Sequence, residues 1–267
     1  MPSRKTQFVA DFATLDIECE KTWNLIGHGN TKGCFQLESR LGRTMAKKLK
    51  PENMEQLSAL ISILRPGCLE AVRDGKTVSN HFIDKKNGNE EVDYFHPSLE
   101  PILKKTYGEM IYQEQAMQIA KELAGFNLQE ADNLRKAIGK KKPEEMAKIK
   151  IKFLEGCRQT KILTDDQAEQ IFGWIEKSQR YSFNKSHAVA YAYDCYISAY
   201  CKAHFPLLFF ASYLQFARYK MDPHSEIKEL YQNATEMNIA VDKPDIRLLN
   251  HSFSISGNTI CFGLTDI

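Results

Sequence analysis

The stretch NLQEADNLRKAIGKKKPEEM, residues 127–146, holds the end signals of two successive helices and indicates a helical fold. Asn127 is suited to cap a helix over Leu128 to Ile138, because its side-chain oxygen can accept hydrogen bonds from the first-turn N–H groups. Gly139 is suited to close that helix. Pro143 fits the first position of the next helix, and the two glutamates after it place negative charge at the positive end of the helix dipole.

Similar signals predict helices on both sides of this stretch. Thr164, followed three residues later by Gln167, predicts a capping box that opens a helix through Ile171, Trp174 and Ile175. Alternation from Ser252 to Phe262 around Gly257-Asn258 predicts a small hairpin. Further helices are predicted over residues 51–64, 110–123, 186–203, 206–219 and 225–237. The predicted fold class is mostly α (α+β), a helical domain with small β elements at the N-terminus and a β-hairpin at the C-terminus.

Composition is typical of a folded intracellular protein. The 267 residues are 43% hydrophobic and 10% aromatic, enough for one large or two small domains. Seven cysteines, an odd number with no Cys-x-x-Cys pair, favour reduced and buried thiols over disulfides or zinc. The longest apolar stretch, residues 206–216, is too short to span a bilayer, and no apolar run follows Met1 as in a signal peptide. We therefore expect a cytoplasmic protein with no membrane partner.

Basic residues gather in two places although the net charge is only +2. Five lie between Arg40 and Lys50 with no acidic residue, and eight lie between Arg135 and Lys152 against two acidic ones. Phosphate is the partner that fits such density, and a solvated helix face is the alternative for each. The run Lys140, Lys141 and Lys142 favours an anion more strongly, because three adjacent like charges at a helix boundary repel one another.

The segment YSFNKSH, residues 181–187, combines aromatic rings with an amide, an ammonium, hydroxyls and an imidazole at a predicted helix start. A helix N-terminus with nearby lysine can bind phosphate, and the rings can stack on a base. The alternative is that Ser186 caps the helix and Phe183 acts as its hydrophobic staple. The tyrosines at 191, 193, 196 and 200 are more typical of core packing, and residues 112–115 fit either a buried polar network or a solvent face.

No catalytic centre is visible. The chain has no Asp-x-Asp pair, and the nearest acids, Asp11, Asp16 with Glu18, and Asp165-Asp166, fit helix caps or surface positions better than a metal site. It also lacks a phosphate-binding Gly-x-x-x-x-Gly-Lys-[Ser/Thr] loop and a Gly-x-Ser-x-Gly elbow. Scattered histidines are the only support for a standalone metalloenzyme.

Seven segments, taken in order from about residue 11 to 267, resemble the bacterial C-family replicative DNA polymerases, the family of the DNA polymerase III alpha subunit. They are GCFQLESR (33–40), LRPG (64–67), FIDKKNG (82–88), residues 106–120, residues 131–146, FNKSH (183–187) and KAHFP (202–206). The order of the segments makes coincidence a poor explanation. The resemblance implies a palm-edge and palm-to-fingers segment over 1–97, helical fingers over 98–240, and a C-terminal β segment over 241–267 leading toward a helix-hairpin-helix region.

The resemblance also implies site residues, alongside the basic clusters. Nucleotide binding falls to Arg135, Lys136, Tyr181, Phe183, Asn184, Lys185, Ser186 and His187. Contact with DNA phosphates falls to Arg40, Arg65, Lys85, Lys86, Lys140, Lys141 and Lys142. Two departures bear on these roles: Lys136 stands where the family has a second arginine, and Arg180-Tyr181-Ser182 replaces Gly-Tyr-Gly. Lysine cannot stack or bind bidentately as arginine does.

The family's metal ligands lie in an Asp-x-Asp motif and a Lys-x-Asp-Phe-Leu-Gly motif, neither of which matches here. We therefore expect no catalytic residue and no metal on this chain alone, and Mg²⁺ only in an assembled polymerase. The expected function is the fingers part of a DNA-directed DNA polymerase, inactive alone, with primer-template DNA, a dNTP and a separate palm-bearing chain as partners, in a bacterial or phage-infected cell. The alternative is a non-catalytic nucleic-acid- or nucleotide-binding module, or a polymerase mimic.

Overall fold

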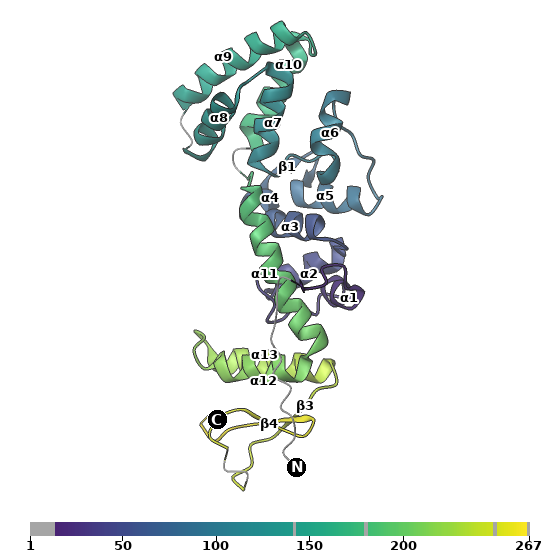
Figure 1. The fold of residues 1–267 in the computed structure, drawn as a ribbon, viewed down its shortest axis with the longest axis vertical. Helices are drawn as coiled ribbons and strands as arrows, with labels where there is room; N and C mark the ends of the chain where they lie inside the picture. The colour runs from purple at the N-terminus through teal and green to yellow at the C-terminus, as the bar shows by residue number, and fades with distance from the viewer. Residues whose placement is uncertain (1–13, 141–142, 179–180, 248–249, 266–267) are drawn as a thin grey trace.

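The computed structural model describes residues 14–140, 143–178, 181–247 and 250–265 and shows an elongated, mostly helical chain (Figure 1). Its α-helices are α1 (Glu20–Gly27), α2 (Arg40–Leu49), α3 (Met54–Ile63), α4 (Pro66–Glu70), α5 (Val78–Lys86), α6 (Glu100–Leu103), α7 (Gln113–Ala124), α8 (Leu128–Lys140), α9 (Pro143–Thr160), α10 (Asp165–Ser178), α11 (Lys185–His204), α12 (Pro206–Ala217) and α13 (Pro223–Glu236). Two short 3₁₀ helices, η2 (Pro97–Leu99) and η3 (Lys104–Thr106), flank α6.

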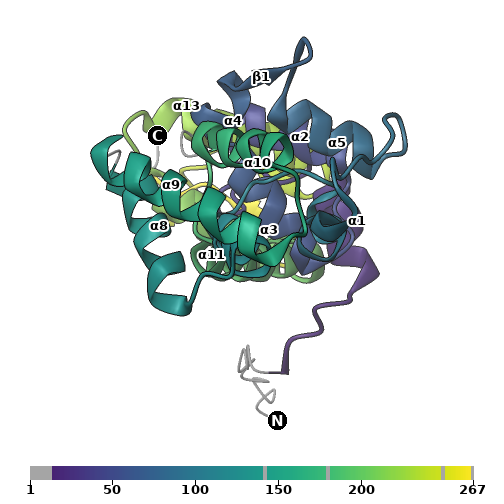
Figure 2. The ribbon, with the colours of Figure 1, turned by 90° about the horizontal axis from the view of Figure 1, so that it is seen from above.

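The β elements are small and lie toward both ends of the chain, which confirms the predicted fold class. Strands β1 (Val72–Arg73) and β2 (Lys76–Thr77) form an antiparallel hairpin, seen at the edge of the molecule in the view along its long axis (Figure 2). Strands β4 (Ser254–Ser256) and β5 (Thr259–Cys261) form the predicted hairpin. Strand β3 (Ala240–Asp242), which we did not predict, pairs parallel to β5.

The helix ends follow local side-chain chemistry in the way the sequence predicts. The Gln167 N–H donates to Thr164 Oγ1 at 3.3 Å and the Thr164 N–H to Gln167 Oε1 at 3.0 Å, which confirms that capping box. Asn127 forms the same reciprocal pair with Glu130 at the start of α8. The α8 backbone runs on to Lys140 rather than closing at Gly139.

The start of α11 differs from the prediction. Asn184, not Ser186, is the N-cap residue, and its side chain accepts a hydrogen bond from the His187 N–H at 2.9 Å. The helix therefore begins at Lys185, and the Ser186 hydroxyl donates to the capping oxygen instead of capping the helix itself. Asn is as effective a cap as Ser, so composition alone does not choose between them.

The buried apolar residues form three clusters, which lie in succession along the molecule (Figure 1). The first joins α1 to α5 with α11, which packs mainly against α3 and α1. The second joins α6 to α10, with Gly156 of α9 so close to Ala124 of α7 that a Cβ there would overlap the Ala124 carbonyl. The third joins α12 and α13 to the C-terminal sheet. Helix α11 thus runs along the first cluster, from the second toward the third.

Candidate nucleotide and DNA interface

The segment before α11 is joined to the segment before α7 by backbone hydrogen bonds. The Phe183 N–H donates to the Ile111 carbonyl and the Gln113 N–H to the Phe183 carbonyl, both at 2.9 Å. Tyr112 and Phe183 thereby form an isolated parallel bridge. We call this pair of bonds the neck. It joins the two ends of the segment 113–182, so that the chain enters and leaves this segment at the same point.

Glu114 holds the start of α11, and its role was not predicted. Its carboxylate accepts from Asn184 Nδ2 and from the Lys185 N–H, each at 2.9 Å. The first N–H groups of α11 are therefore satisfied within the chain. Of the two alternatives for residues 112–115, a buried polar network or a solvent face, the structure shows the network. Gln115 Oε1 accepts from the Ile111 and Tyr112 N–H groups, and its Nε2 donates to Thr106.

The Lys185 side chain is partly exposed and pairs with a carboxylate that lies far away in the sequence. Its Nζ lies 2.6 Å from Glu55 Oε1 on α3, with side-chain exposures of 34% and 31%. The other Glu55 oxygen lies 3.8 Å from Lys105 Nζ, so the carboxylate stands between two ammonium groups. Lys185 Nζ also lies 5.4 Å from the centre of the Tyr112 ring. Glu55 gave no signal in the sequence because 130 residues separate it from Lys185.

Arg65 approaches the same place from the end of α3. Its guanidinium carbon lies 3.5 Å from the centre of the Phe183 ring, a close cation–π contact. Its buried Nε makes no hydrogen bond, and no carboxylate lies within ion-pair distance of it in the described part of the chain. The terminal N–H groups of Arg65 also have no hydrogen-bond partner among the described residues, and they are the donors of this stacked guanidinium that are available to a phosphate.

Aromatic rings continue from this point along α11. The ring centres of Phe183 and His187 are 5.3 Å apart, those of His187 and Tyr191 4.0 Å, and those of Tyr191 and Phe35 5.0 Å. Tyr181 lies at the beginning of the segment, and burial raises the pKa of its phenol. Within the predicted segment, Phe183 therefore meets Arg65, and His187 is connected to Phe35 only through Tyr191.

Lys85 lies in a buried ion-pair cluster rather than on a basic surface. Its Nζ lies 2.9 Å from Glu109 Oε1, and the two side chains are 5% and 1% exposed. Arg73 completes the cluster with two bonds to Glu109, at 2.6 and 3.1 Å. Burial alone would lower the pKa of Arg73, but the Glu109 hydrogen bonds outweigh it and raise that pKa. The Lys85 ammonium is thus already paired with the Glu109 carboxylate. Contact between Lys85 and DNA stays a prediction.

Lys86, Arg40, Arg135 and Lys136 lie apart from residues 181–187. Lys86 donates to the Lys50 carbonyl at 3.0 Å, and Arg40 is exposed at the start of α2. Arg135 and Lys136 both pair with Asp132 of their own helix, at 2.8 and 2.7 Å, which lowers the pKa of that carboxyl. Lys141, Lys142 and the side chain of Lys140 lie outside the described residues. No hydrogen bond, ion pair or ring contact between described residues joins Arg135 or Lys136 to the α11 segment.

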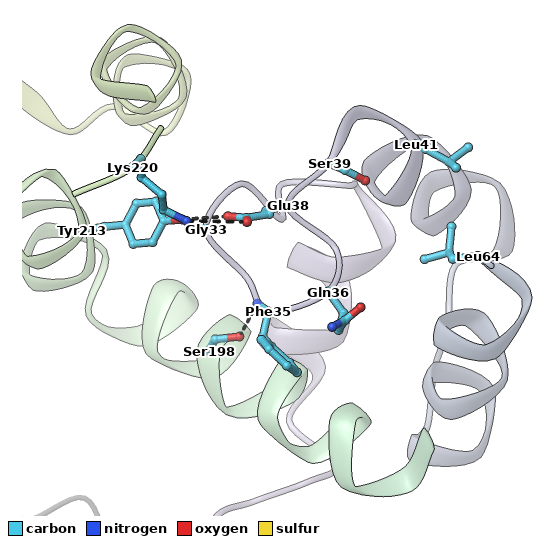
Figure 3. A pocket seen from close by; sticks show the side chains of 10 residues that line it. All are labelled: Gly33, Phe35, Gln36, Glu38, Ser39, Leu41, Leu64, Ser198, Tyr213 and Lys220. Atoms are coloured by element: carbon cyan, nitrogen blue, oxygen red, sulfur yellow. Dashed lines mark hydrogen bonds and ion pairs between the residues drawn. The ribbon is translucent and has the colours of Figure 1, made fainter. Parts of the chain in front are cut away.

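A hollow of about 600 Å³ lies at the far end of the aromatic row (Figure 3). Phe35 and Gln36 lie at its centre, with Leu41 and Leu64 on one side. On the opposite side Glu38 accepts from the Tyr213 hydroxyl at 2.7 Å and lies 3.8 Å from Lys220. We call it the Phe35 pocket.

The described residues offer neither a metal centre nor a membrane span. None of their His, Cys, Asp and Glu side chains form a group of three that could hold a metal ion. The donors in the described ranges therefore do not fit a magnesium site. None of the helices there has the length and apolar character needed to cross a membrane.

Comparison with known proteins agrees with the resemblance noted in the sequence. Residues 2–161 match the family described as the bacterial DNA polymerase III alpha subunit finger domain. The chain is 39% identical over 264 residues to the DNA polymerase III subunit alpha of Caulobacter vibrioides, 41% over 251 to that of Haemophilus influenzae and 40% over 258 to that of Aquifex aeolicus. These alignments cover 99%, 92% and 96% of this chain and 22%, 21% and 21% of the relatives. The chain thus spans about a fifth of their length, and it belongs to the finger-domain family of bacterial DNA polymerase III alpha subunits.

Proposed function

We propose that this chain binds the incoming deoxynucleotide and the primer-template phosphates as the fingers part of a DNA-directed DNA polymerase. The observation that carries the proposal is Arg65, whose guanidinium stacks on Phe183 with no carboxylate partner among the described residues. A half-buried cation without a counter-charge among the described residues, stacked on an aromatic ring, fits a phosphorylated base. Location in the cytoplasm is part of the same proposal.

Residues 181–187 form the core of the proposed nucleotide site. Lys185 and Arg65 meet the triphosphate, and Tyr181, Phe183 and His187 offer faces and edges to the base. Asn184 and Ser186 hold the helix start that carries Lys185. Triphosphate binding at Lys185 displaces the Glu55 carboxylate, which keeps Lys105 as its remaining partner.

We further propose that the remaining predicted residues reach the nucleotide or the DNA when the second cluster closes. Arg135 and Lys136 lie on α8, in the second cluster, which is joined to α11 through the neck. Closure of this cluster toward α11 brings both to the triphosphate. Arg40, Lys86 and the lysines at 140–142 meet DNA phosphates, and Lys85 does so only if its Glu109 pair opens. The same proposal includes the domain boundaries, with the palm-to-fingers segment ending at residue 97 and the helical fingers at residue 240.

Catalysis requires metal-binding carboxylates, which in our proposal come from a palm on another chain that holds Mg²⁺. The cations here would then stabilise the charge on the transferring phosphoryl group. Primer extension tests this arrangement directly. The purified chain is expected to extend a primed template with dNTP and Mg²⁺ only after a palm-bearing polymerase chain is added. Robust extension by the chain alone contradicts the split arrangement, and nucleotide binding that no palm converts into extension supports a non-catalytic module.

Nucleotide binding is tested by titrating a fluorescent dNTP analogue into the chain. Arg65→Ala is expected to weaken binding about tenfold, the usual effect of losing one charge-assisted contact. Arg65→Lys keeps the charge but not the planar stack, so it recovers only part of the loss. Arg218→Ala is the matched control, because Arg218 also stacks on an aromatic ring, that of Tyr219, away from the site. Equal affinity for the Arg65→Ala and Arg218→Ala variants contradicts the proposed site.

A further inference from the structure

The Phe35 pocket lies outside the proposed nucleotide site, and its central ring is held in place without any ligand. Phe35 is 39% exposed, although hydrogen bonds pin the loop that carries it. The Phe35 N–H donates to Ser198 Oγ at 3.0 Å, and Thr31 Oγ1 donates to the Leu37 carbonyl at 2.8 Å. A pinned ring loses little conformational freedom when a ligand covers it.

A row of rings connects this pocket to the start of α11. His187 and Tyr191 are four residues apart on α11 and so lie on one face of the helix, and Phe183 precedes the helix beside His187. Each ring contacts the next, and Tyr191 contacts Phe35 at the pocket. His187 is exposed. The row thus joins the proposed nucleotide site to the pocket through ring contacts that are edge-to-face at both ends.

The polar groups at the pocket offer both a donor and an acceptor. Gln36 has a left-handed backbone, with φ of 64°, which a non-glycine residue rarely adopts. Among the described residues its side-chain amide has no hydrogen-bond partner and is free to bind a ligand. The amide can donate and accept at once, as the edges of nucleic-acid bases require.

One lysine lines the pocket, and one exposed arginine adjoins a lining residue in the sequence. Arg40 follows the lining residue Ser39 and makes no ion pair with any described residue. Lys220 lies on the opposite side, over the Tyr213 ring and 3.8 Å from Glu38. Glu38 offsets part of the Lys220 charge, so Arg40 is the stronger site for a phosphate.

We propose that the Phe35 pocket binds an unstacked base of a single-stranded DNA. The base stacks on Phe35, its edge meets the Gln36 amide, and Arg40 and Lys220 meet the flanking phosphates. The volume, about 600 Å³, lies within the range of small-ligand sites. Aromatic platforms with flanking cations bind single strands with little sequence preference. The proposal rests on the proposed function in one respect: the strand is the template that runs from the nucleotide site.

The test measures fluorescence anisotropy of a labelled twelve-nucleotide oligothymidylate with the full chain and no dNTP. Phe35→Leu keeps the apolar volume but removes the aromatic face, so affinity is expected to fall about tenfold. The matched control is Phe216→Leu. Phe216 is 62% exposed and lines a separate apolar hollow on α12, so its replacement leaves affinity unchanged.

An abasic oligomer of the same length separates stacking from charge. Wild type and Phe35→Leu are expected to bind the abasic strand alike, since neither has a base to stack. Gln36→Gly provides a second variant that should fold well, because glycine favours the left-handed backbone there, and it should lose about threefold in affinity with the amide.

Equal binding of oligothymidylate by wild type and Phe35→Leu would overturn the proposal, as would an equal loss on the abasic strand. Failure of the proposed nucleotide site is separable from this result. Lys185→Ala changes dNTP affinity and not oligothymidylate affinity, and Phe35→Leu does the reverse.

Discussion

Lys85 and Lys185 make nearly the same contact in two different settings. Lys85 meets Glu109 at 2.9 Å with both side chains almost fully buried, and Lys185 meets Glu55 at 2.6 Å with about a third of each exposed. In the sequence both are lysines within segments that resemble a polymerase. Burial alone separates a fixed structural pair from one whose lysine a ligand can reach.

The physical reason is the cost of separating the charges. A buried carboxylate that loses its partners has no water to replace them, whereas an exposed one is rehydrated at once. The Lys185 pair can therefore exchange Glu55 for a phosphate, and the Lys85 pair cannot do so cheaply. Three substitutions test this contrast. Their expected effects decrease from a large loss in the free energy of unfolding to a modest gain in affinity for a dNTP.

Glu109→Gln is expected to lower the free energy of unfolding by about 3 kcal/mol, because Lys85 and Arg73 lose their shared carboxylate while Lys85 remains buried. Urea denaturation followed by circular dichroism measures the change. Glu55→Gln is the matched control, with an expected loss below about 1 kcal/mol. Similar losses for the two variants contradict the distinction between the pairs.

Lys202 shows what burial does to a lysine that has no carboxylate partner among the described residues. It is fully buried, and its Nζ donates to the Lys32 carbonyl at 2.7 Å and to Asn233 Oδ1 at 2.6 Å. Burial lowers its pKa from 10.5 to about 8. Between these values the unfolded chain holds a proton that the folded chain releases, so this group makes stability rise with pH.

We therefore expect the stability difference between wild type and Lys202→Met to shift in favour of wild type by about 2 kcal/mol from pH 8 to pH 10. Urea denaturation of both proteins across this range measures it. Subtracting the variant removes the opposite contribution of thiols such as Cys157, whose pKa burial raises to about 11. A difference that stays constant with pH would show that Lys202 is not the titrating group.

Glu55→Gln is expected to raise affinity for a fluorescent dNTP about threefold, because the triphosphate no longer competes with a carboxylate at Lys185. Glu52→Gln is the matched control: Glu52 lies just before α3, is 72% exposed, and pairs with Lys86 rather than with Lys185. An unchanged affinity for Glu55→Gln would mean that Lys185 does not meet the triphosphate.

Local features of the fold could be predicted because their causes lie within a few residues. The capping boxes at Asn127 and Thr164 and the hairpin around Gly257-Asn258 each depend on neighbours in sequence. The exact start of α11 could not be predicted, since Asn184 and Ser186 are both good caps. Strand β3 was missed because its partner, β5, lies about twenty residues further along the chain.

The candidate site could be predicted only in part, because its contacts join distant segments. Residues 181–187 stand out by composition, but their partners Glu114 and Glu55 lie 70 and 130 residues away. Lys85 and Lys86 adjoin in sequence, yet only Lys85 is held by a buried carboxylate. Tyr191 packs against the first cluster, as predicted, and its second role, joining the rings of His187 and Phe35, gave no signal in the sequence.

The neck between Tyr112 and Phe183 makes residues 113–182 a detour whose two ends meet. Most of the second cluster lies within that detour, with its own apolar core. A detour with adjoining ends can be lengthened, shortened or exchanged without altering the distance that the rest of the chain must bridge. The molecule is therefore built so that this part can change in length while α11, which carries Lys185, keeps its place.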